Sequence, residues 1–402
     1  MKSIHYLTPF FNFLVAVLLG MLLRAVYVYP IAGINFLYIL QAHSHIAMLG
    51  WVYLILYVLL VRIYALETKE EYRFYNRLFW VTQISVIGML CTFPFQGYAM
   101  GSILFSTLHI FCSYFFVYRL WKKNKVQRPF EKALVHTALV FMVLSTFGVW
   151  LMGPAVGLMG KASTFYQVAI QFFLHFQFNG LFLIAVVVVF LHYVFKDFNP
   201  NRFKLFYGLL LASVVLSFSF PMSWYIDGWG LQLMSSIGMC LQLGAFGSFV
   251  YFNREVFVHL WKTQTTIEKL VLGFSLFSLA LRLGMQVLTL IPVLAEQAYL
   301  IRHWTVGFIH LNMLGIITGL LIWVLMRMQV IQVTLVYTWA TLCFVLSYFL
   351  TELTLFIEGS VLFLSVKPFF NSYVLLFWLS IGLPVGILMW LGSLFNLKTS
   401  RV

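Results

Sequence analysis

Histidines inside apolar stretches are the residues of this chain with the clearest chemical potential. His43 and His45 lie in segment 42–51, and His310 lies in segment 304–311. An imidazole inside hydrocarbon is costly unless it has a partner, so such residues usually serve a site or join helices. A neutral imidazole is also a good iron ligand. Two histidines at similar depth on different membrane spans therefore predict a haem held between them.

The composition places the chain in a membrane. Hydrophobic residues make up 62% of the 402 residues and charged residues only 9%, whereas soluble domains have about 25% charged residues. Loop charges that set orientation explain the net charge of +14, so we expect membrane lipid and no nucleic acid as a partner. The four cysteines lie apart inside apolar stretches, which indicates core packing and not disulfides or a zinc site.

Twelve stretches are long and apolar enough to cross a bilayer, which needs about 20 residues. We therefore expect an all-α fold, a polytopic membrane helix bundle of 12 transmembrane helices in which residues 1–402 form a single integral membrane domain. The expected spans are 8–29, 38–64, 78–100, 101–121, 133–157, 164–195, 205–222, 231–253, 268–295, 301–326, 330–352 and 370–396.

Basic residues test this count because they gather in cytoplasmic loops. With the N-terminus inside, every basic residue falls in an inside segment apart from five: Lys161, Arg302 and Lys367 are outside, and Arg24 and Arg282 lie within spans. This alternation predicts that both termini are cytoplasmic. The start of the chain shows no cleavage pattern of a signal peptide, so we expect the first span to be retained.

Span direction and a helical rise of ~1.5 Å per residue place the histidines in depth. His43 lies roughly 8 Å below the outer surface and His310 about 12 Å, on the second and tenth spans. His45 points some 200° away from His43 around the helix, so only one of them can face a given haem. We favour His43. A pattern His-x-x-Met-Leu-Gly shared by 45–50 and 310–315 supports His45 instead.

His175 lies about 16 Å deep on the sixth span and shares a helix face with Asn179. The other histidines have plainer interpretations. His109 and His136 are expected to join neighbouring helices, and interfacial or loop positions are expected for His5, His192, His259 and His303.

The second and tenth spans resemble the catalytic subunit of the haem–copper oxidase superfamily, especially C-type cytochrome oxidases and bacterial nitric oxide reductases. Segments 42–45 and 308–315 carry this resemblance. It implies a cytochrome c oxidase subunit I-like fold and a low-spin haem b with His43 and His310 as axial iron ligands. It also implies a place in the bacterial inner membrane, additional membrane subunits, and quinone or a separate cytochrome as the electron partner.

The sixth span resembles the reductase motif His-x-x-x-Glu-Gly in segment 175–180, which implies that His175 binds a metal. Segment 223–237 is similar to the stretch that follows the family's metal-binding His-His pair. The departures are larger than these matches. Phe308 stands where the high-spin haem ligand would be, Pro221-Met222 stands near the His-His pair, and Asn179 replaces the glutamate. Oxygen or nitric oxide reduction by the usual route is therefore not expected, and no catalytic residue is assigned.

Segments 43–45 and 303–307 also resemble the nitric oxide response membrane proteins, which contain haem and copper. Under this likeness His45 and His303 become candidates, with His303 binding a haem propionate or a second metal. Cations near the outer side suit haem propionates in the oxidase family, and here these are Arg24, Arg302 and Lys367. For Arg24 the alternative is snorkelling to the interface.

Arg282 lies in the middle of a span, and we expect it to pair with a carboxylate such as Glu352 or to line a wet cavity. Glu352 is expected near the outer end of its span. Acidic residues within the other spans are nearly absent, which argues against a proton pump built from carboxylates.

Three functions follow from these residues. The first is a membrane b-type haem protein for electron transfer or sensing. The second is a divergent respiratory oxidase or nitric oxide reductase-like oxidoreductase, with copper or another metal at a site rebuilt from His175, His45 or His109. The third is a transporter or assembly factor without haem, whose histidines only join helices.

Overall fold

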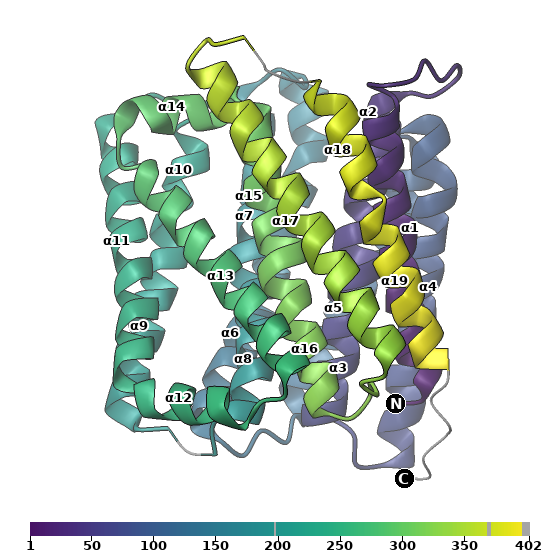
Figure 1. The fold of residues 1–402 in the computed structure, drawn as a ribbon, viewed down its shortest axis with the longest axis vertical. Coiled ribbons are helices and arrows are strands. Elements are labelled where there is room, and N and C mark those ends of the chain that lie inside the picture. Colours follow the sequence, from purple (N-terminus) through teal and green to yellow (C-terminus); the bar gives the residue numbers. More distant parts are fainter. Residues whose placement is uncertain (197, 368–370, 396–402) are drawn as a thin grey trace. The chain divides into compact units, whose positions relative to one another are not determined.

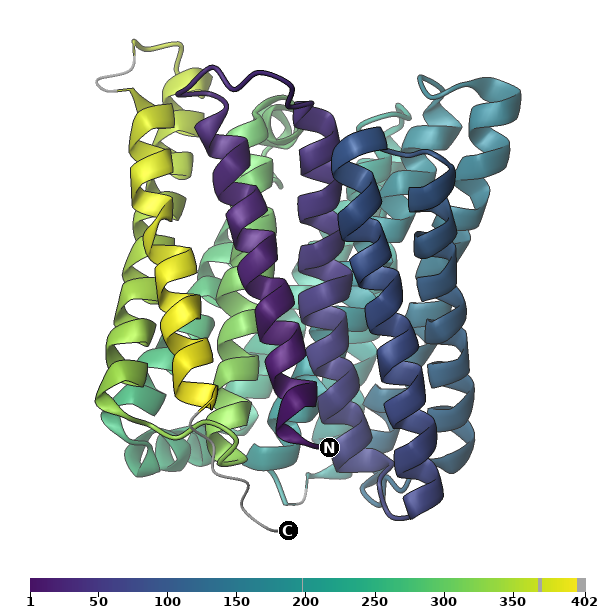
Figure 2. The same ribbon diagram turned by 90° about the vertical axis from the view of Figure 1, so that its right-hand side faces the viewer.

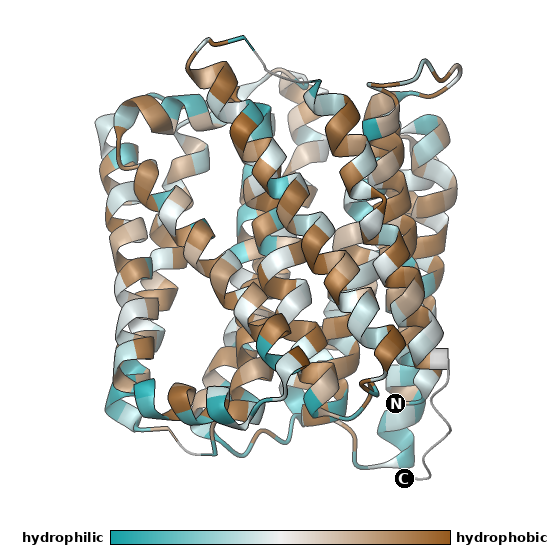
Figure 3. Ribbon diagram, viewed as in Figure 1, coloured by the Kyte–Doolittle hydropathy of each residue, from teal (hydrophilic) through white to brown (hydrophobic). Residues whose placement is uncertain are grey.

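The computed structural model describes residues 1–196, 198–367 and 371–395. All regular structure in these residues is helical, and twelve helices there are long and apolar enough to cross a membrane. Figure 3 shows apolar residues along the helices and hydrophilic ones gathered mainly near their ends. The prediction of an all-α protein with twelve membrane spans is confirmed: the chain is a polytopic membrane protein.

Three of the spans are each divided into an α-helix, a π-helix and a second α-helix. They are α2 (Phe36–His45), η1 (Ile46–Tyr53) and α3 (Leu54–Tyr64); α7 (Thr164–His175), η2 (Phe176–Phe182) and α8 (Leu183–Val194); and α15 (Arg302–His310), η3 (Leu311–Thr318) and α16 (Gly319–Arg327). The other spans are α1 (Ser3–Ala25), α4 (Lys69–Gln96), α5 (Met100–Lys123), α6 (Pro129–Met159), α9 (Pro200–Leu216) with α10 (Ser219–Met222), α11 (Trp229–Phe252), α13 (Thr266–Leu288), α17 (Leu335–Phe363), and α18 (Ser372–Ser380) with α19 (Gly382–Phe395). Two shorter helices, α12 (Arg254–Thr263) and α14 (Pro292–Leu300), lie outside the spans.

The boundary between the third and fourth spans falls where the sequence indicates a turn. α4 ends at Gln96, and Gly97 follows with a φ of 59°. Glycine has no Cβ and adopts this left-handed conformation at little cost, so it reverses the chain there. Ser102 then donates a hydrogen bond to the carbonyl of Gly97 in the first turn of α5.

The eleventh span differs from its prediction. The expected range was 330–352, but α17 runs from Leu335 to Phe363. The residues after Glu352 are mostly apolar and keep helical backbone, so the carboxylate does not mark the end of the span. Glu352 therefore lies well inside a membrane helix, with Glu358 six residues further along the same helix.

The chain folds into two compact units. Unit 1 contains Met1–Asn124, Leu270–Ser278 and Ile301–Val402, and unit 2 contains Lys125–Lys269 and Leu279–Leu300. Within unit 1, α1 packs against α2 and η1 and also against α18 and α19 (Figure 2). We call the end of unit 1 where α1 begins the near end, and the end where α1 gives way to α2 the far end (Figure 1).

The three divided spans are the most buried in the protein. The most apolar windows of the second, sixth and tenth spans are 78%, 83% and 78% buried, against 50% or less for the other nine. In each of the three, the helix before the π-helix is mostly part-exposed, whereas the π-helix and the helix after it are almost entirely buried. We call these three spans the inner spans. Each is part-exposed before its π-helix and almost entirely buried from the π-helix onwards.

An ion cluster joins the first turn of α6 to the last turn of α8 in unit 2. The Glu131 carboxylate lies 2.8 Å from Arg128 Nη1 and 3.0 Å from His192 Nδ1. Arg128 also donates to the carbonyls of His192 and Phe195. The Glu131 side chain is 3% exposed, so its charge depends on these partners. His192 was expected at an interface, and in the structure it contributes to this cluster.

We expect Glu131→Gln to destabilise the protein by about 1–3 kcal/mol, because a buried charge-assisted hydrogen-bond acceptor is lost. The measurement is the unfolding midpoint of purified protein in detergent. Glu70→Gln is the matched control. It removes the ion pair between Glu70 and Arg119, in which the Glu70 side chain is 78% exposed. This control should change stability by less than about 1 kcal/mol. Equal effects of the two variants would contradict the prediction.

Candidate functional site

His43 lies three residues before the start of η1 and faces α1. Its Nδ1 lies 2.7 Å from the carbonyl oxygen of Ala16. A carbonyl only accepts hydrogen bonds, so Nδ1 carries the proton and Nε2 keeps its lone pair. Gly20 makes room for this ring, because a Cβ at that position would lie 2.9 Å from His43 Cε1. The α1 backbone thus fixes both the tautomer and the position of the His43 imidazole.

His310 is held in the same way by a side chain. Its Nδ1 lies 3.0 Å from Glu352 Oε1, and the two side chains are 20% and 10% exposed. The carboxylate accepts a hydrogen bond from Nδ1–H, so in the neutral imidazole the lone pair lies on Nε2. The position predicted for Glu352, near a span end, is therefore wrong: the longer α17 brings its carboxylate beside the tenth span.

The two imidazoles belong to one electrostatic cluster in unit 1. His43 lies within electrostatic range of both His310 and the guanidinium of Arg24. Arg24 is also within range of Glu352, and its Nη1 lies 3.4 Å from the carbonyl of Leu376. Both histidine residues are part-exposed, although the π-helices that follow them are buried. Four charged or ionisable side chains from four spans therefore gather at the level of the two rings.

His45 lies on another side of the second span. Its Nδ1 hydrogen-bonds the carbonyl of Gln41 in its own helix, and its Nε2 lies 3.3 Å from the hydroxyl of Tyr98. Its ring centre lies 4.2 Å from that of Phe93. Both ring nitrogens therefore already have polar neighbours, in contrast to those of His43. This arrangement supports His43 over His45 as a metal ligand.

His109 is buried next to η1. Its ring hydrogen-bonds the backbone of Leu49 and packs edge-on against Tyr53, with 4.6 Å between ring centres. His109 Nε2 and the Tyr53 hydroxyl are buried without a hydrogen-bond partner among the described residues. A π-helix widens one turn and shifts its carbonyls, and here a histidine from a neighbouring helix binds one of them. The predicted helix-joining role of His109 agrees with this contact.

His175 belongs to unit 2 and uses both ring nitrogens. Nε2 lies 2.8 Å from the carbonyl of Val214, and Nδ1 lies 3.3 Å from Asn179 Nδ2. A metal at His175 would have to displace one of these hydrogen bonds. Asn179 Oδ1 in turn accepts a 2.6 Å hydrogen bond from Arg282. The sequence suggested Glu352 as the partner of Arg282, and the structure instead provides this neutral amide.

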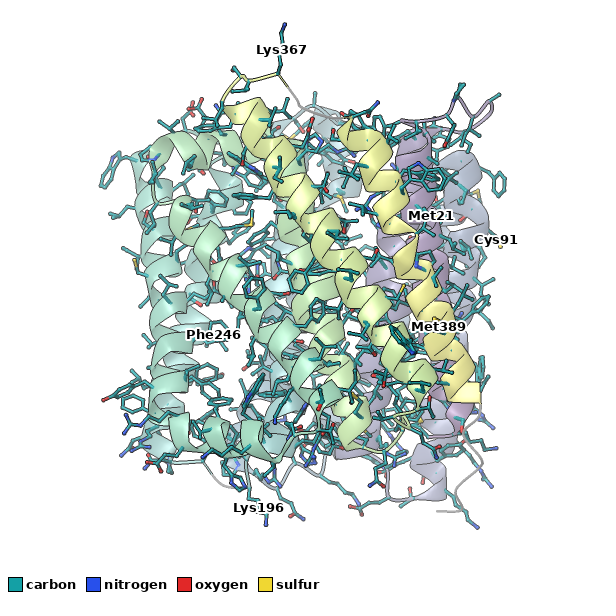
Figure 4. All side chains as sticks on the ribbon, in the orientation of Figure 1. Met21, Cys91, Lys196, Phe246, Lys367 and Met389 are labelled. Carbon is teal, nitrogen blue, oxygen red and sulfur yellow. The ribbon has the colours of Figure 1, made fainter. Side chains whose placement is uncertain are left out.

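The remaining candidate residues lie towards the far end of unit 1. The Arg302 guanidinium lies 5.3 Å from the ring centre of Phe36. His303 packs near Tyr373, and its Nδ1 is buried without a hydrogen-bond partner in the described chain, as is Trp304 Nε1. Lys367 is different: it lies in the loop after α17 and extends away from the helices (Figure 4). The structure therefore does not bring Lys367 to the two histidine rings.

The other histidines lie elsewhere in the chain. His5 lies in the first turn of α1, at a span end as predicted, but it is buried there and its Nε2 lies 2.8 Å from Asn76 Oδ1. His259 is exposed on α12, and His136 is part-exposed on α6. Among the residues that the structure describes, no three His, Cys, Asp or Glu side chains form a group that could hold a metal ion.

The comparison of 45–50 with 310–315 missed a related segment in the sixth span, which shares the histidine and the glycine of that pattern. Each inner span contains a histidine followed five residues later by glycine, and the π-helix begins directly after that histidine. The glycines are Gly50, Gly180 and Gly315, and a Cβ on each would collide with or crowd a neighbouring helix. The spans are four apart in the chain, so the spacing His-x-x-x-x-Gly in every fourth span was a signal available in the sequence.

Neither a family model nor a curated protein matches this chain in comparisons with known proteins. Fold and site together define an α-helical, multi-pass membrane protein with twelve spans. Its candidate site consists of two histidines on different spans of unit 1, each with Nδ1 held by a fixed acceptor.

The two buried tyrosines of η1 and α3 offer a test of the packing beside this site. Tyr57 donates a 2.8 Å hydrogen bond to the carbonyl of Tyr75, whereas the buried Tyr53 hydroxyl has no partner in the described residues. We expect Tyr57→Phe to cost about 1 kcal/mol and Tyr53→Phe to be neutral or stabilising. Unfolding midpoints of the two variants check this. A larger loss for Tyr53→Phe would indicate a bound water at its hydroxyl.

Proposed function

We propose that this protein is a membrane b-type haem protein in which His43 and His310 are the axial ligands of the iron. The observation that carries the proposal is the matched state of the two rings: both Nδ1 atoms hold their protons on fixed acceptors, and both Nε2 lone pairs remain for a metal. We further propose a fold like that of the haem–copper oxidase subunit I, in a bacterial inner membrane with both termini cytoplasmic. The loop charges and the inner second and tenth spans support this part.

The donor atoms present suit a haem in their chemistry. His43 and His310 belong to two different helices, so they would hold a haem iron between the second and tenth spans. The helices α2 and α15, which precede the π-helices and carry the two rings, have few buried side chains. The buried Nδ1 of His303 and Nε1 of Trp304 are polar atoms to which haem carboxylates would give partners.

Charged side chains near His43 and His310 would tune the electronic properties of a haem bound by the two histidines. Glu352 accepts a hydrogen bond from His310 Nδ1–H, which would make that imidazole a more electron-rich ligand. Arg24 lies within electrostatic range of Glu352 and of His43, so a cation and a carboxylate balance each other inside the membrane. Arg302 adds a second cation towards the far end.

A bound haem would supply reversible one-electron chemistry. Two imidazoles would complete the coordination of a haem iron and leave no position for oxygen or another gas. Electron transfer or redox sensing is therefore the function that this site supports best. Phe308 stands where the resemblance would require a further haem ligand, and Pro221-Met222 stands near the position of its metal-binding His-His pair. Asn179 replaces the glutamate of the reductase motif. Quinone or a separate cytochrome is the proposed electron partner, and copper is not required.

An optical spectrum of protein purified after expression with ample haem tests the proposal. We expect reduced b-type bands that do not shift with carbon monoxide. His43→Ala and His310→Ala should each abolish these bands, whereas His45→Ala should keep them. Haem content by pyridine haemochrome assay, with unfolding midpoints to show that each variant is folded, completes the measurement.

Three results would contradict the proposal. Loss of haem from His45→Ala alone would move the ligand to the other ring of the second span. A carbon monoxide shift would indicate an open iron site and favour an oxidoreductase. A visible spectrum without haem bands in folded wild-type protein would favour a transporter or assembly factor.

The role of Glu352 gives a second prediction. Glu352→Gln removes the negative charge from the His310 hydrogen bond, so the oxidised form of the iron should be less stabilised and the midpoint potential of bound haem should rise. Glu358→Gln, in the same helix, is the matched control and should change the potential less. A redox titration monitored optically measures both, and a fall in the potential of Glu352→Gln would show that the carboxylate does not act through His310.

A further inference from the structure

A surface hollow lies on α12 in unit 2, far along the chain from the residues of the candidate site. It has a volume of about 340 Å³ and is lined by Arg254, Glu255, Val258, His259 and Lys262. Figure 1 shows α12 running sideways from the lower end of α11 towards the start of α13. With 10 residues, α12 is too short to cross a membrane. The loop charges predict that this end is cytoplasmic.

One face of α12 is anchored and the other is exposed. Leu260 is buried, and Phe257 packs against Phe195 and Phe249 with 6.2 Å and 5.6 Å between ring centres. Val258 and Trp261 are 53% and 43% exposed. A helix with this pattern at the end of membrane spans lies along the lipid interface, where exposed tryptophan is favoured.

The exposed face has its charges at defined positions. Arg254, Val258 and Lys262 are spaced by four residues and form one row along the helix. The two cations are separated by roughly 12 Å of helix axis, with an apolar side chain between them. Glu255 and His259 form the neighbouring row. The lining of the hollow therefore has an apolar side chain between two cations of one helix row.

Aromatic side chains and a further cation surround this row. The Arg254 guanidinium lies 6.0 Å from the ring centre of Tyr251, and that of Arg202 lies 5.3 Å from the ring centre of Phe252. Arg202 also donates a 3.0 Å hydrogen bond to the carbonyl of Phe252, which holds it beside the start of α12. Lys196 projects from the same end of unit 2 (Figure 4). Tyr251 and Phe252 are both exposed, as expected for residues at a lipid–water boundary.

We propose that this hollow binds the headgroup of an anionic phospholipid. Arg254 and Lys262 each offer a cation to a phosphate, and the glycerol and upper acyl chain lie on Val258 between them. Charge complementarity selects the occupant: cations at a membrane interface attract anionic lipid headgroups, and an apolar side chain between them suits an amphiphile and not a free ion. Cations at both ends of the row favour a lipid with two phosphates over a lipid with one.

Lipid-dependent thermal stability of delipidated protein in detergent tests this proposal. We expect phosphatidylglycerol to raise the unfolding temperature, diphosphatidylglycerol to raise it more, and phosphatidylcholine to leave it unchanged. Inorganic phosphate at millimolar concentration should have no effect. The variant with Arg254→Gln and Lys262→Gln should lose at least half of the rise, whereas Arg254→Lys with Lys262→Arg should keep it.

Two further variants separate a lipid site from general surface charge. Lys122→Gln with Lys123→Gln removes two cations from the last turn of α5 and should keep the full response. Val258→Asp keeps both cations of the hollow but places a carboxylate between them, and it should lose the response. An undiminished rise in both Val258→Asp and the double glutamine variant of α12, or an equal loss in the α5 control, would overturn the proposal. A rise with inorganic phosphate equal to that with lipid would reduce the site to an ion site.

Discussion

Hydrocarbon offers no hydrogen bonds, and the inner spans of this protein are organised by the need to satisfy polar groups without water. His43 uses a backbone carbonyl of α1, and His310 uses the carboxylate of Glu352. Trp51 in η1 donates to Thr318 at the end of η3, which ties the second and tenth spans together within unit 1. An unpaired imidazole at such depth would cost more free energy than most single contacts supply. The partners therefore fix where each ring lies.

The π-helices extend the same constraint to the backbone. A widened turn changes the directions of its carbonyl groups, and side chains then bind them. Asn12 of α1 donates to the carbonyl of Gly50, and Thr318 donates to that of Met313 within η3. The glycine in each π-helix lets an adjacent helix come close, so the part of the span after the histidine becomes densely packed. His45, His175 and His310 each lie at the boundary between the part-exposed and the buried part of their span, and His43 lies two residues before His45.

Two charged side chains of unit 1, Arg24 and Glu352, bear directly on the proposed haem. Arg24 and Glu352 come from the first and eleventh spans and lie within electrostatic range of each other and of the histidine pair. A cation and an anion that balance each other reduce the cost of burial for both. The cations of α12 have a different environment, because they are exposed at the end of unit 2 and depend on lipid or water for their partners. The two proposals thus concern separate parts of the chain and separate physical conditions.

The sequence by itself determined the class and the number of spans, because both follow from the local composition of stretches of about 20 residues. It also identified His43 and His310 as the histidines of interest. Only the tertiary structure decided that His43 meets α1 while His45 meets Phe93 and Tyr98, since the rotation of a helix depends on all its neighbours. The partnership of Glu352 with His310 was likewise beyond the sequence, because it joins residues 42 positions apart on two helices.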